Sequence, residues 1–384
     1  MKILYGINSN GQGHINRSRI FISELQKDGH EVHILFAGKK PPEYAHELAE
    51  KTLYKKGAVD LYNNHKVAIT KTLSNHFVRL PIYAKTRKEV LELDRKENYD
   101  AFFTDFESST SVVGRKLRKP VISIDHQHSI FHPKAKKAPG KFYDKLGLLF
   151  VFIYMIPHYN RAFTLDFVTD IKTSKKCTLF PLIWKPEFNR YDIRLGSHYV
   201  AYLARHDPQK ITAVLNQIPH ETFHVYGFDR DKQIGNVIFK KTSREGFLQD
   251  LANAKAVIGN AGFSLTWETC IINKLIWIMP HKHQFEQETN AHRLKTYDRA
   301  YVSEKLTVED FYAFSEWAES KNFKPEKKLS ILPASELMER AYNYLERYRS
   351  ENFLSRREKR KRIRREISPW RLRQNILRDI RINP

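Results

Sequence analysis

Short apolar runs alternate with segments of helical periodicity along the first half of the chain. Strands are predicted at 3–7, 31–36, 101–104 and 121–124, and helices at 15–27 and 109–117. Continuous apolar strands are typical of a parallel sheet that is covered on both faces. We therefore expect the first half to be a doubly wound α/β structure.

The same alternation resumes after a stretch that contains Pro181 and Pro186. Strands are predicted at 198–203, 222–226, 256–258 and 275–279, and helices at 208–217, 244–254, 265–273, 284–297, 308–320 and 335–349. We expect an N-terminal Rossmann-like domain at 1–180, a linker at 181–196, a second Rossmann-like domain at 197–350 and a tail at 351–384. Two Rossmann-like domains place the carboxyl ends of both sheets around one cleft, where ligands of open α/β sheets bind.

The loop after the first predicted strand combines glycine with histidine. It reads Gly11-Gln12-Gly13-His14 and leads directly into the first predicted helix. Glycine lets the backbone turn tightly and leaves amide N–H groups open at the helix start. Imidazole is suited to proton transfer near neutral pH, so His14 is a candidate general base, and helix capping is the alternative.

Carboxylates and histidines follow two more of the predicted strands. Asp105 comes after the strand at 101–104, where a carboxylate beside His14 fixes the ring tautomer and stabilises the imidazolium. The alternative is that Asp105 caps the next helix. Asp125, His126 and His128 follow the strand at 121–124, and they either line the acceptor side or form a hydrogen-bonded loop.

Two strand ends in the second half carry residues suited to a nucleotide sugar. A glycine turn around Gly262 offers bare backbone to a diphosphate at a helix start. Glu268 follows within that helix, where a carboxylate suits the paired hydroxyls of a ribose, and Glu286 with Gln287 suits a sugar ring. The predicted donor-binding residues are Gly11, Gly13, Arg205, Asn260, Gly262, Phe263, Ser264, Glu268, Glu286 and Gln287. A plain surface arginine is the alternative for Arg205, and a surface position on the helix, beside a core-packing Trp267, is the alternative for Glu268.

The order of these motifs resembles that of GT-B glycosyltransferases of the UDP-glycosyltransferase type. It is also similar to the bacterial enzymes that add N-acetylglucosamine to a lipid-linked muramyl precursor. Gly11 to His14 looks like the first-loop motif, whose histidine is the base, and Asp105 falls where plant-type members carry the aspartate that orients it. Gly262 through Trp267-Glu268 keeps the spacing from glycine to the ribose-binding glutamate.

The resemblance continues through Glu286-Gln287 and Asn290, which look like a sugar-binding Asp-Gln pair followed by Asn, and it covers the chain to about residue 350. Three residues depart from the plant-type pattern: Asn260 replaces a phosphate-binding histidine, Ser264 an asparagine and Glu286 an aspartate. The resemblance implies transfer of a sugar from a nucleotide-sugar donor, UDP-linked, to a hydroxyl of a membrane-associated or lipid-linked acceptor. Direct displacement assisted by one base implies inversion at the anomeric carbon.

No acidic triplet suited to a divalent metal stands near the donor loop, so we expect neither an obligatory metal nor a further cofactor. The two cysteines, Cys177 and Cys270, exclude a disulfide framework. The first residues read as a strand and not as a signal peptide, and the longest apolar run, at 146–156, is too short to span a bilayer. We therefore expect a cytoplasmic protein, peripheral on the inner face of the membrane.

The net charge of the chain predicts an anionic partner. The chain has 66 Lys and Arg against 43 Asp and Glu, a net charge of +23, and such an excess favours nucleic acid, acidic lipid or phosphorylated substrates. The tail at 351–384 carries 12 basic and 4 acidic residues, a net charge of +8, and apolar residues recur at near-helical spacing from Trp370 to Ile380. This pattern predicts a basic amphipathic helix.

Two segments therefore predict contact with an anionic membrane surface: the apolar run at 146–156, which follows several lysines, and the tail at 351–384. A buried core helix is the alternative for the first segment. The tail alternatively binds nucleic acid or folds back on the N-terminal domain. Three rival functions also stay open: a nucleotide-sugar 2-epimerase, a nucleic-acid-binding protein, and a glycosyltransferase acting on modified DNA bases.

Overall fold

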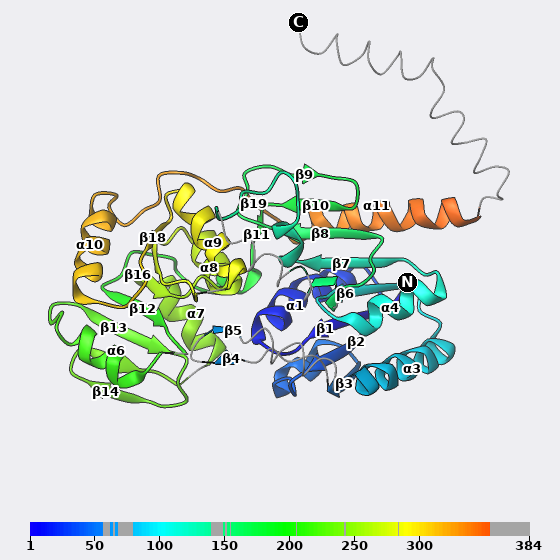
Figure 1. Ribbon diagram of the computed structural model, residues 1–384, viewed down its shortest axis with the longest axis horizontal. Helices are drawn as coiled ribbons and strands as arrows, with labels where there is room; N and C mark the ends of the chain where they lie inside the picture. The colour runs from blue at the N-terminus through cyan, green and yellow to red at the C-terminus, as the bar shows by residue number, and fades with distance from the viewer. Residues whose placement is uncertain are drawn as a thin grey trace, which may run out of the picture. The chain divides into compact units, whose positions relative to one another are not determined.

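The computed structural model describes residues 1–56, 62–63, 66–67, 80–139, 149, 152–153, 155–204, 206–241, 243–282 and 284–353. The chain forms two compact units, Met1–Leu337 and Met338–Pro384. The first unit contains two large sheets with helices on their faces (Figure 1). The described part of the second unit is 338–353, which belongs to α11 (Ala334–Phe353).

The N-terminal half is built on an eight-stranded sheet with the order β3-β2-β1-β6-β7-β8-β10-β9. Its elements, with a separate two-stranded pair β4-β5, are β1 Lys2–Asn8, α1 Gln12–Lys27, β2 Glu31–Gly38, η1 Glu43–Leu48, β3 Lys51–Lys56, β4 Tyr62–Asn63, β5 Lys66–Val67, α3 Leu80–Glu97, β6 Ala101–Asp105, α4 Ser108–Leu117, β7 Val121–Asp125, η2 Gln127–Ile130, β8 Arg161–Leu165, β9 Lys172–Thr173 and β10 Cys177–Phe180. The strands of the large sheet pair in parallel except β9, which runs antiparallel to β10.

The C-terminal half repeats this plan on a seven-stranded sheet with the order β14-β15-β13-β12-β16-β17-β18. Its elements are β12 His198–Tyr202, α6 Pro208–Leu215, β13 Thr222–Tyr226, β14 Lys232–Ile234, β15 Val237–Phe239, α7 Arg244–Ala252, β16 Ala254–Gly259, α8 Phe263–Ile271, β17 Ile276–Ile278, α9 Phe285–Thr296, β18 Ala300–Val302 and α10 Val308–Glu319. The predicted α/β architecture of two doubly wound, Rossmann-like halves is confirmed. The basic tail expected after α11 lies outside the described residues.

The stretch predicted as a linker at 181–196 contains two short elements. Strand β11 (Leu182–Ile183) pairs in parallel with β19 (Ile331–Leu332), and the 3-10 helix η3 (Pro186–Arg190) follows. A chain segment from the end of the second half therefore returns to the junction between the sheets. The division into domains at these residues stays a prediction.

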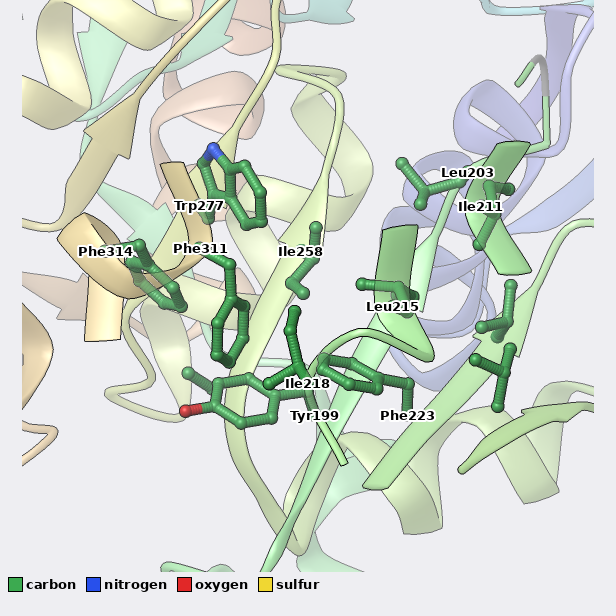
Figure 2. Packing of buried hydrophobic residues seen from close by; sticks show 14 of the residues in the cluster. Tyr199, Leu203, Ile211, Leu215, Ile218, Phe223, Ile258, Trp277, Phe311 and Phe314 are labelled. Carbon is green, nitrogen blue, oxygen red and sulfur yellow. The ribbon is translucent and has the colours of Figure 1, made fainter. Parts of the chain in front are cut away.

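Apolar side chains between the C-terminal sheet and its helices form one large core (Figure 2). Phe311 and Phe314 of α10 pack against Tyr199 of β12 and Trp277 of β17, with ring centroids 5.2 Å apart for Tyr199 and Phe311. Burial of apolar surface is the dominant favourable contribution to folding, and aromatic side chains bury a large area each. The core holds the strands in register, and it thereby positions the loops at their carboxyl ends.

Among the helices of the described ranges, none combines the length and apolar character needed to cross a bilayer. The apolar run at 146–156 is described only at Leu149, Phe152, Ile153, Met155 and Ile156. Phe152, Met155 and Ile156 are buried, whereas Leu149 and Ile153 are 37% and 57% exposed. The segment is therefore divided between core packing and exposed apolar surface.

Candidate active site

Two helices begin at the same pocket, and both begin with a glycine. Gly11 is the N-cap of α1 and Gly262 is the N-cap of α8, and neither helix start has a side-chain capping hydrogen bond. The first N–H groups of a helix have no partner within the helix. Both helix starts therefore offer backbone donors and the positive end of a helix dipole to whatever occupies the pocket.

The two helix starts lie in close approach. A Cβ atom added to Gly13 would lie 2.6 Å from Ser264 Oγ, a distance that would force one of the two to shift. Gly13 therefore allows a close approach between α1 of the N-terminal half and α8 of the C-terminal half, where a larger residue would require the Ser264 hydroxyl to move. The contact brings the first loop to the predicted donor loop.

The pocket beside these helix starts has a volume of about 490 Å³. Both halves line it. The predicted donor-binding residues found in its lining are Gly11, Gly13, Asn260, Gly262, Phe263, Ser264, Glu268 and Gln287. Glu286 is half-buried on α9 but not part of this lining, and Arg205 lies outside the described residues.

Several lining residues were missed by the sequence analysis. Asn16 of α1, Arg244 and Phe247 of α7, Tyr202 at the end of β12, and His281 after β17 all reach the pocket. Their positions just after parallel strands or in the first turns of helices are the available signal, because that edge of the sheet is where ligands bind. No sequence motif distinguishes them from neighbouring polar and aromatic residues.

His14 and Asp105 are brought together from different elements. His14 Nδ1 lies 2.8 Å from Asp105 Oδ1, and the His14 ring stacks on Phe106 with centroids 5.9 Å apart and planes at 8°. The carboxylate is fully buried at the end of β6, and the next residue, Phe106, has a φ of 56°. This left-handed residue turns the chain sharply after Asp105.

The turn that follows is held by Glu107, and it explains a glycine in β1. Glu107 is the N-cap of α4, and its carboxylate accepts hydrogen bonds from the N–H groups of Ser109 and Thr110. Gly6 of β1 lies against this cap, because a Cβ added there would be 2.6 Å from Glu107 Oε2 and 2.5 Å from Thr110 Oγ1. Glu107, and not Asp105, caps the helix, so the capping alternative for Asp105 does not hold.

Arg17 is a third member of the His14 and Asp105 group, and the sequence analysis did not identify it. Its Nε and Nη2 donate to Asp105 Oδ2 and Oδ1 at 2.9 and 2.5 Å. Ser18 Oγ donates to the same carboxylate at 3.0 Å. Burial alone would raise the pKa of Asp105, but the charges of Arg17 and His14 and their hydrogen bonds more than offset it, so this pKa lies below its ordinary value.

Glu268 lines the pocket floor within a group of buried charges. Lys185 Nζ and Arg244 Nη1 lie 2.6 and 2.8 Å from its Oε1, and Arg244 also pairs with Glu187. Lys185 lies over the ring of Trp267 at 4.2 Å. Burial opposes the charge of Glu268, yet its two cationic partners and their hydrogen bonds lower its pKa, so the carboxylate is ionised.

The other predicted polar residues of the second half are held by backbone groups. Asn260 Nδ2 donates to the Met279 carbonyl at 2.7 Å, and Gln287 Oε1 accepts from the His281 N–H at 3.0 Å. These bonds orient both side chains at the pocket edge. Each amide keeps further hydrogen-bonding capacity for a ligand.

The three residues expected on the acceptor side are all buried. Asp125 Oδ2 is 2.5 Å from His128 Nδ1. His126 stacks on Phe263 with ring centroids 3.7 Å apart, and its Nδ1 donates to the Leu165 carbonyl at 2.8 Å. These contacts agree with the alternative of a hydrogen-bonded loop, and a role of these residues in acceptor binding stays a prediction.

Two groups of residues in the described ranges have ligand atoms close enough to hold a metal: His198, His224 and Asp250, and Glu31, His33 and Glu97. Neither group contributes to the pocket lining. Lys240 Nζ already lies 2.6 Å from Asp250 Oδ2, and Lys2 and Lys51 pair with Glu97. Lysines therefore already compensate a carboxylate in each group.

The family model described as Glycosyl transferase family 1 matches residues 1–315. Comparison with curated protein sequences gives no match.

Solved structures share the fold at low sequence identity. The glycotransferase of kitacinnamycin aligns with a TM-score of 0.58 and 14% identity over 83% of this chain and 90% of its own. UGT2 of Phytolacca americana, complexed with UDP-2fluoro-glucose and pterostilbene, aligns with a TM-score of 0.57 and 12% identity over 84% of this chain and 92% of its own. The spinosyn rhamnosyltransferase SpnG, complexed with thymidine diphosphate, aligns with a TM-score of 0.56 and 14% identity over 84% of this chain and 93% of its own.

Burial of His126 predicts a pH-dependent stability. Burial first, and then the charge of Arg293, lowers the pKa of His126 to about 3, whereas the unfolded chain has a value of about 6.5. Its contribution to stability is therefore complete above about pH 6.5 and decreases as the pH falls toward 3, by at most about 1.4 kcal/mol per pH unit. The unfolding free energy of His126→Gln should decrease less steeply than that of the wild type between pH 6.5 and 4.

Urea denaturation at a series of pH values measures this difference in slope. The matched control is His220→Gln, because His220 is exposed and should leave the slope at its wild-type value. Equal slopes in the wild type and His126→Gln contradict the prediction, whatever the absolute stability of the variant.

Proposed function

This chain belongs to glycosyl transferase family 1, and we propose that it transfers a sugar from a UDP-sugar to a hydroxyl of a membrane-associated or lipid-linked acceptor. The observation that carries the proposal is the convergence of two glycine-capped helix starts on one pocket. Their open N–H groups and dipoles suit a diphosphate, both bound in the donor and departing as the leaving group.

The pocket also suits the rest of the donor. Its volume of about 490 Å³ falls within the range of pockets that enclose small ligands, roughly 300–1,000 Å³. We propose that Glu268 accepts hydrogen bonds from the ribose hydroxyls and that Gln287, with Glu286 beside it, binds the sugar. Neighbours of the same fold that are complexed with thymidine diphosphate or UDP-2fluoro-glucose support a nucleotide-sugar donor.

His14 is proposed as the general base. With Nδ1–H donating to Asp105 Oδ1, Nε2 carries the lone pair that takes the acceptor proton. The acceptor oxygen then forms a bond to the anomeric carbon, while the bond to the diphosphate breaks and its electron pair leaves with the diphosphate. Attack from the face opposite the leaving group inverts the anomeric centre.

The helix starts supply the positive potential for the leaving group, so we propose that no divalent metal is obligatory. Arg244 is a cation in the described part of the lining. It pairs with Glu187 and with Glu268, the residue proposed to bind the ribose, so its charge is already balanced there. Activity should therefore persist in EDTA.

We propose that the acceptor is presented at an anionic membrane. The net charge of +23 and the exposed Leu149 and Ile153 support this location. Phe152 and Met155 of the same segment pack with Tyr83 and with Phe106, the ring on which His14 stacks. The segment that carries the exposed apolar residues is therefore linked to His14 through Phe106.

Removal of the base tests the mechanism. His14→Ala should lower turnover by about 10²–10⁴-fold, because the acceptor hydroxyl then attacks without losing its proton to the enzyme. Release of UDP from UDP-glucose or UDP-N-acetylglucosamine in the presence of extracted membrane lipid measures turnover. His46→Gln, at an exposed histidine, is the control, and near-wild-type turnover of His14→Ala contradicts the assignment.

Calorimetry with UDP and a UDP-sugar tests the donor site. Loss of Glu268 alone would leave Lys185 buried without its partner, which costs about 3–5 kcal/mol of stability. The double variant Lys185→Met/Glu268→Gln avoids this charge and should weaken both ligands, whereas Gln287→Ala should weaken only the sugar-bearing ligand. Lys185→Met alone, which keeps the carboxylate, is the matched control. Unchanged affinities in the double variant and in Gln287→Ala exclude this donor map.

Cosedimentation with vesicles tests the membrane location. Binding to phosphatidylglycerol-containing vesicles should exceed binding to phosphatidylcholine vesicles and should fall with salt, because each engaged cation contributes about 1 kcal/mol. Removal of 351–384, or the double substitution Leu149→Ser/Ile153→Ser, should weaken it. Equal binding to both vesicles, or to neither, removes the support for a membrane-presented acceptor.

A further inference from the structure

The buried carboxylate of Asp105 is shared between a histidine and an arginine. His14 Nδ1 lies 2.8 Å from Oδ1, and the Arg17 guanidinium binds both oxygens, with Nε at 2.9 Å from Oδ2 and Nη2 at 2.5 Å from Oδ1. Both Arg17 and Asp105 are almost completely buried. A bidentate pair of this kind has little freedom to rearrange.

Arg17 is charged in this position. Burial opposes its positive charge, but the carboxylate of Asp105 more than offsets this and raises the pKa of Arg17. The guanidinium therefore compensates the buried negative charge of the carboxylate that contacts His14. An uncompensated carboxylate at 2.8 Å would favour a protonated ring.

Arg17 also contacts the ring itself. Its Nη2 lies 3.0 Å from His14 Nδ1, and Asp105 Oδ1 is the acceptor that both N–H groups share, so a protonated ring would place its positive charge directly beside the guanidinium. The ring has Asp105 of β6 on one side and Phe106 against its face. Across the cleft, Glu286 of α9 acts on Arg17 by its charge, as does Asp125 at the end of β7.

We propose that Arg17 is a positioning residue that lets Asp105 orient His14 without holding a proton on it. The hydrogen bond from Nδ1 fixes the ring, and the guanidinium offsets the field that the carboxylate exerts on it. This inference rests on the proposed function for its catalytic meaning, but the charge compensation itself is measurable without any substrate.

The direct measurement is the NMR titration of the His14 ring in protein labelled with ¹³C at histidine, with the His14 signal identified by its loss in His14→Gln. In Arg17→Met the midpoint should move up by roughly 1–2 pH units, because the carboxylate now acts on the ring alone. Arg17→Lys, which keeps the charge, should move it less. The control is Arg19→Met, which removes an exposed arginine of the same helix and should leave the midpoint unchanged.

A second pair of variants keeps the inference testable if Arg17→Met does not fold. In Arg17→Met/Asp105→Asn no charge of the pair is left, and the midpoint should return to within about half a unit of the wild type. In Asp105→Asn alone, Arg17 is left without its partner beside the ring, and the midpoint should fall by about one unit. Equal midpoints in the wild type, Arg17→Met and Asp105→Asn overturn the inference.

The pH dependence of turnover separates positioning from mere structural support. The acid limb of the Arg17→Met profile should move to higher pH with the ring, so that activity lost at pH 7 recovers near pH 9. A structural defect would instead lower turnover by the same factor at every pH, and that result contradicts the inference. If the ring midpoint moves as expected while His14→Gln keeps full turnover, the charge compensation stands and the proposed base does not.

Discussion

The close approach of two helix starts is the constraint on which the rest of the site depends. Gly13 of α1 lies against the side chain of Ser264 of α8, and Gly11 and Gly262, the N-caps of the two helices, both line one pocket. Each helix follows a parallel strand of a different sheet, and the strand order brings β1 and β16 to the interior of those sheets. A nearly equivalent βα unit from each half thereby directs backbone N–H groups toward the same pocket.

Buried charges around this pocket occur in pairs, and the pairs join distant parts of the chain. Asp105 is compensated by Arg17 of α1, and Glu268 by Lys185 from the segment between the two sheets. An unpaired charge at either place would be costly to bury. Pairing also changes the charge next to His14. The Asp105 carboxylate is hydrogen-bonded to His14, but its negative charge is already balanced by Arg17.

The elements predicted from periodicity correspond to strands and helices that carry the pocket, including β1, α1, β6, β16 and α8. The helix α3, and the strands β8 and β10, were not predicted. Strand β8 begins with Arg161 and includes Thr164, and β10 includes Thr178, so neither is a continuous apolar run. Pairing of β8 with β7 and with β10 places Thr164 and Thr178 inside the sheet, where both are buried, whereas Arg161 is half-buried at the start of β8.

The sequence by itself determined the α/β class, the two-fold repetition of the plan and most of the pocket, because local periodicity and glycine turns are properties of neighbouring residues. It placed His14 and Asp105 at strand ends of one sheet edge. Only the tertiary structure decided that Arg17 lies between them, that Lys185 and Arg244 hold Glu268, and that His126 packs beneath α8 and not in the pocket. The contacts of Asp105 with Arg17 and of Glu268 with Lys185 join residues far apart in the chain, and their energies depend on burial and charge compensation that no local pattern records.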